Sequence, residues 1–267
     1  MHTYSLEHQG YLKKKRIEFI IVHFFRIIIV ILFFFLWEVL SSNNIINSFI
    51  FSSPLKIINT IRELLIKGEL IKHVITTINE ILISFIVSSI LGIIISIVLW
   101  SNKLLSRIID PFITIINSLP KVALGPLIII WIGANNNSII FMALMINLFV
   151  TIIGIYNGFI SINENYIIMI KSFGARKYQI FNKIVFPSSI SSIINTLKIN
   201  ISMSLIGVIM GELLVSKCGI GYLIMYGSQV FNIDLVLSSI FILGIVSFLM
   251  YYFVEIIERL IKKKYKC

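Results

Sequence analysis

Long runs without a charged residue constrain this chain more than any other feature of its sequence. Residues 81–102 form an uncharged run of 22 residues, and residues 235–254 form one of 20. A third run, 122–163, covers 42 residues and is interrupted midway by the polar, turn-forming stretch 133–138. The hydrocarbon core of a bilayer is roughly 30 Å thick, and about 20 apolar residues of α-helix cross it. These runs therefore predict four membrane-spanning helices.

The composition supports a membrane protein and excludes an ordinary soluble domain. Of the 267 residues, 58% are hydrophobic and 13% are charged, whereas soluble domains carry about 25% charged residues. The net charge of +11 is gathered in short basic clusters between the apolar runs. This is the pattern of cytoplasmic loops beside an anionic leaflet, so we discount nucleic-acid binding. Cys218 and Cys267 lie far apart in the sequence, which indicates neither a disulfide nor a metal site.

Two weaker runs complete the set of spans. Residues 193–215 include Lys198 near one end, where its long side chain can reach the headgroups. Residues 19–40 include Arg26 and, near the far boundary, Glu38. The chain is thus predicted to be an all-α, polytopic membrane protein with six transmembrane helices, at about 19–40, 81–100, 112–132, 139–160, 193–215 and 235–257.

Basic residues in the loops predict the orientation. With the N-terminus in the cytoplasm, the inner segments hold fifteen Lys and Arg residues and the outer segments five, and cytoplasmic loops carry the excess of positive charge. We therefore expect residues 1–18 and the tail 260–267 in the cytoplasm and residues 41–72 outside. In that outer loop, residues 53–67 predict an amphipathic helix. It lies across the bundle or in the headgroup layer, or else contacts an external partner protein.

The longest cytoplasmic segment, here called the 161–190 connection, is amphipathic. Apolar residues recur at helical spacing on both sides of Gly174, which predicts two short helices hinged at this glycine, and Pro187 suits the start of the next span. The apolar stripe packs on the base of its own bundle, or Tyr178 and Phe181 insert into the groove of a partner protein. In the second case the basic side chains would form the rim; these are Lys171, Arg176, Lys177 and Lys183.

A family resemblance becomes visible in this connection. Nine residues separate Gly174 from Ile184-Val185-Phe186-Pro187, which resembles the signature of type I ABC-importer permeases, EAA, three residues, Gly, nine residues, Ile-x-Leu-Pro. The chain departs from the signature at Ile168-Met169-Ile170, where the family has EAA. The partner contacts that the family's glutamate makes are therefore not carried over to this chain.

Further fragments are similar to the nitrate, sulfonate and taurine branch of these permeases, from about residue 37 to the C-terminus. They are Trp37-Glu38, Ser53-Pro54, Lys67-Gly68-Glu69-Leu70, Asp110-Pro111, Leu119-Pro120, Gly125-Pro126-Leu127, Trp131 with Gly133, Gly211-Glu212 and Gly219-Ile220-Gly221-Tyr222. The resemblance implies a type I ABC importer permease fold, residues 73–259 being the transmembrane domain. It also implies dimerisation, an extracytoplasmic binding protein and a separate ATPase docked on a coupling loop at 161–190.

The same resemblance implies roles for individual residues. In the coupling loop, Gly174 is the hinge, Ala175 allows close approach, Tyr178 and Phe181 are docking anchors, and Arg176 and Lys177 are rim contacts, with Pro187 closing the segment. The sequence contains no Gly-x-x-x-x-Gly-Lys-Ser/Thr phosphate loop. We therefore expect a transport subunit that is not an enzyme, has no cofactor and depends on ATP hydrolysis elsewhere.

Acidic residues near the spans are candidates for the transport pathway. Glu80 and Glu255 stand at span edges, where we expect water to reach them. Glu212 lies deeper, and it either lines the pathway or is a structural hydrogen-bonding residue. Gly219 and Gly221 predict a tight re-entrant turn or, alternatively, a gate.

The sequence also bears on two other classes of function. A proton-coupled secondary transporter could use Glu212 as its titrating acid, but such transporters usually have repeated halves, and the sequence shows no internal repeat. A membrane enzyme is disfavoured, because the four histidines are scattered and have no metal-ligand spacing. The bias toward Ile, Asn and Lys is typical of an AT-rich bacterial genome, and we expect the protein in a bacterial inner membrane. The substrate is expected among sulfonates, nitrate, taurine and vitamin precursors.

Overall fold

The computed structural model describes residues 6–265, and the regular structure of these residues is helical, without a β-strand. The helices are α1 (Leu6–Ser42), α2 (Ser48–Phe51), α3 (Pro54–Ile66), α4 (Glu69–Ser101), α5 (Lys103–Ser118), η1 (Lys121–Leu124), α6 (Gly125–Ile132), α7 (Asn136–Ile160), α8 (Glu164–Ser172), α9 (Lys177–Ile180), η2 (Phe181–Val185), α10 (Phe186–Val215), α11 (Ile220–Gln229) and α12 (Ile233–Tyr265). Cys267 and the first five residues of the predicted segment 1–18 lie outside the described part. The chain divides into two units, Met1–Glu63 and Leu64–Cys267.

The first unit is built on α1, which has 37 residues. Its stretch Lys14–Ser42 is long and apolar enough to cross a membrane, and the most apolar window of that stretch has no buried residue. Two hydrogen bonds join the end of α1 to the segment that leads into α3. The backbone N–H of Leu55 donates to Glu38 Oε2 at 3.0 Å, and Ser41 Oγ donates to the carbonyl of Ser52 at 2.9 Å.

Five stretches are long and apolar enough to be spans: Lys14–Ser42, Glu69–Ser101, Asn136–Ile160, Lys177–Val215 and Ile233–Leu260. There is a sixth crossing if α5 and the η1–α6 segment act together, although the two parts are bent by 82°. The sequence predicts one helix here, at 112–132. The helix ends earlier because Leu119 precedes Pro120, whose ring disfavours the α conformation of the residue before it. Leu119 accordingly adopts φ −64° and ψ 142°.

In the second unit, α7 packs on both α4 and α10. Small residues allow these helices to approach closely. A Cβ atom at Gly207 of α10 would lie 2.5 Å from the Cα of Ala143 on α7, and one at Gly92 of α4 would lie 2.6 Å from Cγ2 of Thr151. Ser96 of α4 also donates a hydrogen bond of 3.0 Å to a backbone carbonyl of α7. Close contacts of this kind are what hold helices together in lipid, so α4, α7 and α10 form the scaffold of the unit.

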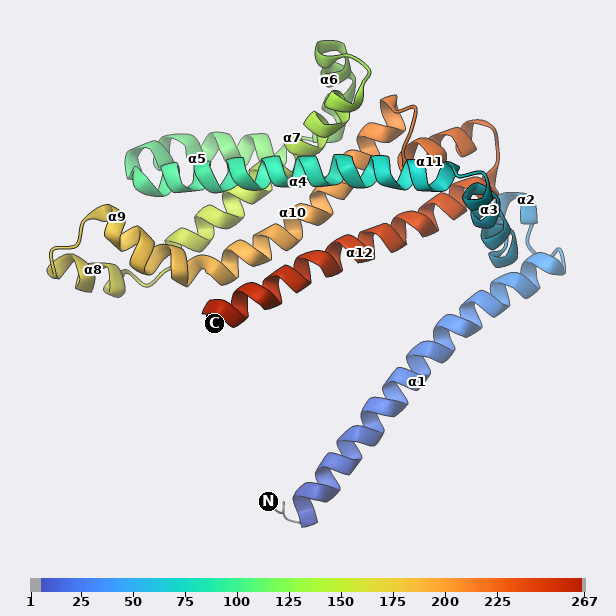
Figure 1. The fold of residues 1–267 in the computed structure, drawn as a ribbon, viewed down its shortest axis with the longest axis horizontal. Helices are drawn as coiled ribbons and strands as arrows, with labels where there is room; N and C mark the ends of the chain where they lie inside the picture. Colours follow the sequence, from blue (N-terminus) through green and yellow to red (C-terminus); the bar gives the residue numbers. More distant parts are fainter. Residues whose placement is uncertain (1–5, 266–267) are drawn as a thin grey trace. The chain divides into compact units, whose positions relative to one another are not determined.

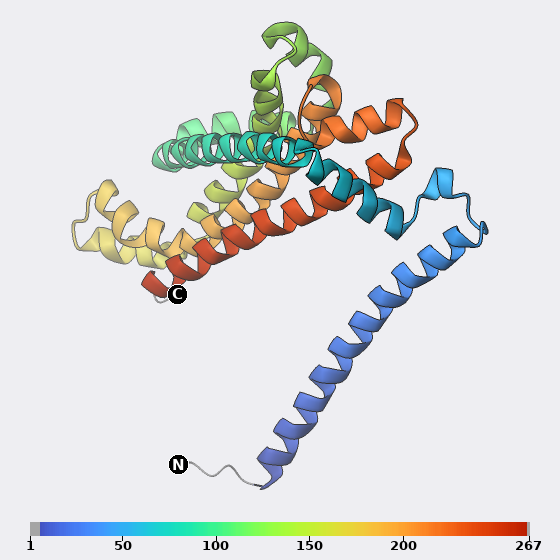
Figure 2. The same cartoon turned by 45° about the vertical axis from the view of Figure 1, so that its right-hand side comes forward.

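Different structures lie at the two ends of this scaffold. Figures 1 and 2 show α8 and α9 at one end of the second unit and α11 at the other. The first end holds the 161–190 connection between α7 and α10, and the second holds the turn between α10 and α11. Because α10 runs from one end to the other, it links the two regions that contain the predicted site residues.

Candidate functional site

The 161–190 connection folds as two short helices with a glycine turn between them. The Asn163 side chain caps α8 by accepting a hydrogen bond of 2.9 Å from the N–H of Asn165. The helix ends at Phe173, and Gly174 then adopts φ +78°, in the left-handed region that favours glycine. A Cβ atom at this position would meet no atom within 4 Å. Glycine is therefore needed at the turn for its backbone freedom, not for space.

The part of the connection after Gly174 packs on its own bundle. Ile180 and Val185 are buried in one cluster with Ile155 and Phe159 of α7, and Ala175 lies against that cluster. The ring of Phe181 is centred 5.5 Å from that of Phe159 and 5.0 Å from that of Trp100. For these residues the structure matches the first alternative of the sequence analysis, in which the apolar stripe covers the base of the bundle.

Two aromatic residues of the connection face away from the bundle. Phe173 is 82% exposed and Tyr178 is 75% exposed, on either side of Gly174. Tyr178 and Phe181, which the sequence predicts as a pair of anchors, thus have different surroundings. The chain winds as a π-helix over Phe181–Val185, and this change of side-chain spacing separates their environments.

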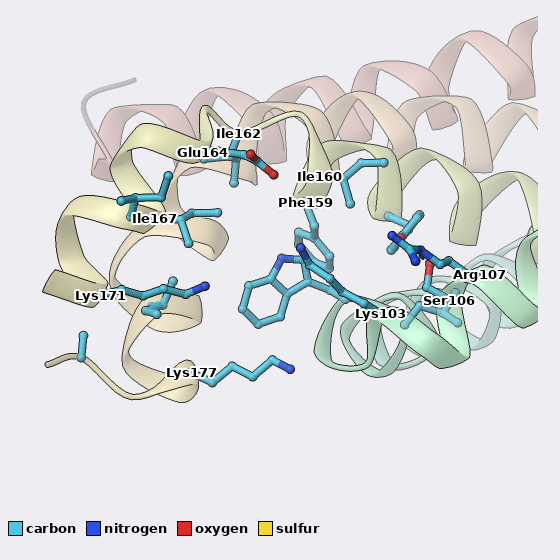
Figure 3. Close-up of a pocket in the computed structure, with 16 residues that line it drawn as sticks. Lys103, Ser106, Arg107, Phe159, Ile160, Ile162, Glu164, Ile167, Lys171 and Lys177 are labelled. Atoms are coloured by element: carbon cyan, nitrogen blue, oxygen red, sulfur yellow. Dashed lines mark hydrogen bonds between the residues drawn. The ribbon is translucent and has the colours of Figure 1, made fainter.

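A cavity of about 650 Å³ lies between this connection, the end of α4 and the start of α5. Figure 3 shows Lys171 and Lys177 on the side of the connection, and Lys103 and Arg107 on α5. Lys177 donates a hydrogen bond to the carbonyl of Ser101. Glu164 is the acidic residue in the lining. The predicted rim of basic residues is therefore extended by α5 and surrounds a space with an apolar floor.

Of the remaining predicted residues of the connection, Lys183 is exposed in η2, and the other two lie near the ends of α9 and η2. Arg176 is exposed and precedes α9, where its backbone N–H donates to Gln179 Oε1 at 2.7 Å. Pro187 is half-buried at the start of α10, directly after the π-helical segment Phe181–Val185.

At the other end of α10, Glu212 is buried, with 1% exposure, and accepts two hydrogen bonds. The Thr77 hydroxyl donates to Oε1 at 2.7 Å, and the backbone N–H of Gly221 donates to Oε2 at 2.6 Å. Gly221 stands in the first turn of α11, where the positive end of the helix dipole favours a negative charge. The structural alternative for Glu212, a hydrogen-bonding residue inside the bundle, describes its position well.

Glu80 lies beside Glu212, one turn of α4 from Thr77. Its side chain is within hydrogen-bonding reach of the Glu212 carboxyl. Glu80 is 2% exposed, and neither of its carboxyl oxygens receives a hydrogen bond from a donor in the described part of the chain. The expectation that water reaches Glu80 at a span edge is wrong: α4 already begins at Glu69, and Glu80 is buried beside Glu212 of α10.

Gly219 and Gly221 make room for the Glu212 carboxylate. A Cβ atom at Gly219, which adopts φ +127°, would lie 2.2 Å from Glu212 Oε1, and one at Gly221 would lie 2.7 Å from Glu212 Cβ. Successive amides of the turn also point at α4: the N–H of Gly219 donates to His73 Nδ1 at 2.9 Å, and that of Ile220 donates to Thr77 Oγ1 at 2.8 Å. We call Thr77, Glu80, Glu212, Gly219 and Gly221 the glutamate junction.

Three members of the glutamate junction are predicted from the sequence, Glu212, Gly219 and Gly221, and two are not. Thr77 belongs to no motif that indicates a function, and Glu80 is expected from the sequence to lie at the membrane edge. Their spacing of three residues places both on one face of α4, and this spacing is the one signal that could have grouped them. Glu255, the other edge acid, pairs with Arg259 at 2.8 Å and is partly exposed.

Comparison with known proteins identifies the family. A family model described as the binding-protein-dependent transport system inner membrane component matches residues 88–266. The chain belongs to this family. It is therefore the membrane-embedded permease component of an ABC importer, a multi-pass membrane protein and not an enzyme. Its family implies an ATPase partner, which hydrolyses ATP, and a substrate-binding protein.

Relatives of this permease are known from several bacteria. A putative aliphatic sulfonates transport permease protein, SsuC of Bacillus subtilis, is 25% identical over 228 residues, which are 85% of this chain and 83% of the relative. The formylaminopyrimidine transport permease protein ThiX of Halalkalibacterium halodurans is 26% identical over 226 residues, 85% of this chain and 90% of the relative. These matches confirm the predicted family and favour an ABC permease over the proton-coupled alternative.

A solved structure confirms the fold of the permease. It shows the MetNI methionine ABC transporter in an inward-facing conformation, and it matches with a TM-score of 0.63 at 17% sequence identity. The match covers 73% of this chain and 96% of that chain. The all-α, type I importer permease fold predicted from the sequence is thus confirmed.

Proposed function

We propose that the chain forms one half of the translocation pathway of its importer and that a second copy supplies the other half. The solute is a small molecule of the sulfonate, nitrate, taurine or vitamin-precursor class, delivered by the binding protein outside the cell. The names of the relatives, which refer to aliphatic sulfonates and to formylaminopyrimidine, support this range. In this proposal both termini lie in the cytoplasm, and membrane lipid covers the exposed apolar helices.

The ATPase docks on the 161–190 connection in this proposal. The observation that carries the assignment is the exposure of Phe173 and Tyr178, 82% and 75%, on the two sides of Gly174. Large apolar side chains that face away from a water-exposed turn are typical of anchors for a partner protein. Arg176 and Lys177 lie beside Tyr178 and supply rim contacts, and the half-buried Ala175 lets the two surfaces approach closely.

The geometry of α10 supports a mechanism for coupling. From Lys177 to Val215 the chain forms one continuous helical stretch through α9, η2 and α10. Ile180 and Val185 are buried against α7 and fix the start of this stretch to the bundle. A movement of the ATPase that displaces Tyr178 therefore tilts α10 as a rigid body. Its far end carries Glu212, which we assign with Gly219 and Gly221 to the gate at the outer side.

The docking proposal is tested by co-purification of the affinity-tagged chain with the ATPase subunit. Gly174→Leu is expected to insert into the membrane normally and to lose at least ten-fold in bound ATPase, because leucine disfavours φ +78° and changes the turn between α8 and α9. Gly174→Asn is the matched control, since asparagine tolerates the left-handed conformation, and it is expected to retain the complex. An unchanged complex with Gly174→Leu would reject the docking proposal.

The substrate class is tested in proteoliposomes that contain the permease, its ATPase and its binding protein. Uptake of labelled taurine, an alkanesulfonate, nitrate and formylaminopyrimidine is measured with ATP inside the vesicles and, separately, with an imposed proton gradient alone. We expect ATP to drive uptake of one of these solutes. Uptake driven by the gradient without ATP would instead support the secondary transporter.

A further inference from the structure

The glutamate junction has too few hydrogen-bond donors for both of its carboxyls to be ionised. An ionised carboxylate only accepts hydrogen bonds. Glu212 accepts one from Thr77 and one from Gly221, whereas Glu80 accepts none from the described residues and yet lies against the Glu212 carboxyl. Two buried carboxylates in contact would repel each other and leave the charge of Glu80 without any compensation.

No basic side chain relieves this conflict within the described residues. The ion pairs there join Lys198 to Glu258 and Arg259 to Glu255, both away from the junction. The charged groups near the start of α4 are Glu69 and Lys72, and both interact electrostatically with His73. The His73 ring faces the turn and accepts the N–H of Gly219 through Nδ1. The Glu212 carboxyl instead accepts hydrogen bonds from the Thr77 hydroxyl and the Gly221 amide, and Glu80 lies beside it.

One proton between the carboxyls resolves the conflict, and the donors decide which residue holds it. The Gly221 amide, in the first turn of α11, and the Thr77 hydroxyl both stabilise the charged form of Glu212. The Thr77 hydroxyl is 2.7 Å from Glu212 Oε1 and 3.2 Å from the carbonyl of His73, so the carboxylate is its nearer acceptor. Glu80 has no donor that would stabilise its charge, and it is therefore the better place for the proton.

We infer that Glu80 is protonated and donates a hydrogen bond to an ionised Glu212, so that one bound proton joins α4 to the turn between α10 and α11. Glu80 acts as a positioning residue for Glu212. The carboxylate then has three donors, from the Thr77 hydroxyl, the Gly221 amide and the Glu80 carboxyl. Loss of the proton would place two negative charges side by side and push α4 away from α10. This hydrogen bond does not depend on which solute is carried or where the ATPase docks.

The first test compares two substitutions of equal size, Glu80→Gln and Glu212→Gln, in the full-length chain purified in lipid nanodiscs. Glutamine at position 80 keeps a hydrogen-bond donor toward Glu212, so its melting temperature is expected to stay within about 2 °C of the wild type. Glutamine at position 212 presents an amide to groups that need an acceptor, and a drop of about 5 °C or more is expected. Glu80→Leu, which has no donor, should also melt at a lower temperature than Glu80→Gln.

The second test observes the proton directly and does not depend on stability. Infrared difference spectra of wild type against Glu80→Gln, recorded in H2O and in D2O at neutral pH, should contain a carboxylic-acid C=O band that shifts on deuteration and is missing in the variant. The ionised-carboxylate bands should be the same in both proteins. Loss of a carboxylate band instead of a carboxylic-acid band would overturn the inference, as would a Glu80→Gln variant that melts as low as Glu80→Leu.

Discussion

The two ends of α10 are built on opposite principles. At the 161–190 connection, large apolar and basic side chains face outward around an open turn, and a Cβ atom at Gly174 would touch nothing within 4 Å. At the glutamate junction, polar groups are buried, three successive backbone amides are held by side chains, and a Cβ atom at Gly219 would lie 2.2 Å from Glu212. One end presents exposed side chains to a partner, whereas the other holds the turn amides and Glu212 in internal hydrogen bonds.

The place of a substitution therefore decides which property it changes. A change at an exposed side chain of the 161–190 connection leaves the fold of the chain intact and alters association, whereas a change in the glutamate junction alters folding before it alters transport. Matched substitutions at the two ends therefore measure how far this contrast extends.

The largest effect is expected from alanine in place of the two turn glycines. Gly219→Ala forces a side chain into the Glu212 carboxylate at φ +127°, and we expect a loss of more than about 3 kcal/mol of stability, or no accumulation in the membrane. Gly174→Ala meets only the backbone strain of φ +78° and should lose about 1 kcal/mol. Thermal unfolding of both purified variants tests this difference between the two ends. Equal melting temperatures would show that the crowding at Gly219 does not matter for stability.

The second effect separates two aromatic residues that are three positions apart in the sequence. Phe181→Ala removes ring contacts with Trp100 and Phe159 and is expected to cost about 2 kcal/mol of stability. Tyr178→Ala removes a side chain that is 75% exposed, so stability should change by less than about 0.5 kcal/mol while ATPase co-purification falls several-fold. If Tyr178→Ala keeps the full amount of ATPase, Tyr178 is not an anchor.

The structure of the 161–190 connection could be predicted from the sequence more fully than that of the glutamate junction. Gly174 stands at a fixed distance from Pro187, and its helices show their amphipathic spacing locally, so a linear pattern was sufficient. Phe181 escaped that pattern because the helix widens at this point into a π-turn, which helical spacing does not anticipate. Glu80 was misplaced for a different reason. Glu80 lies beside Glu212, which is more than a hundred residues away in the sequence, and an acid near the start of a predicted span carries no local sign of such a neighbour.

The third effect tests the hydroxyl at the centre of the glutamate junction. Thr77→Val keeps the shape of the side chain but leaves Glu212 Oε1 and the N–H of Ile220 without their partner, for an expected loss of about 2 kcal/mol. Thr77→Ser keeps the hydroxyl and should lose less than about 1 kcal/mol. Equal melting temperatures for the two variants would show that the methyl group, and not the hydrogen bonds, holds α4 to the turn.

The smallest effect on stability is expected from the charges at the exposed end. Arg176 is solvent-exposed, so Arg176→Ala should change the unfolding free energy by less than about 0.5 kcal/mol. It should nevertheless weaken ATPase association a few-fold at low salt, and this difference should vanish at high salt because screening removes long-range attraction. Lys217→Ala is the matched control, since Lys217 is also exposed but lies in the turn before α11. An equal salt-dependent loss for Lys217→Ala would mean that the attraction comes from the overall positive charge of the chain and not from the docking end.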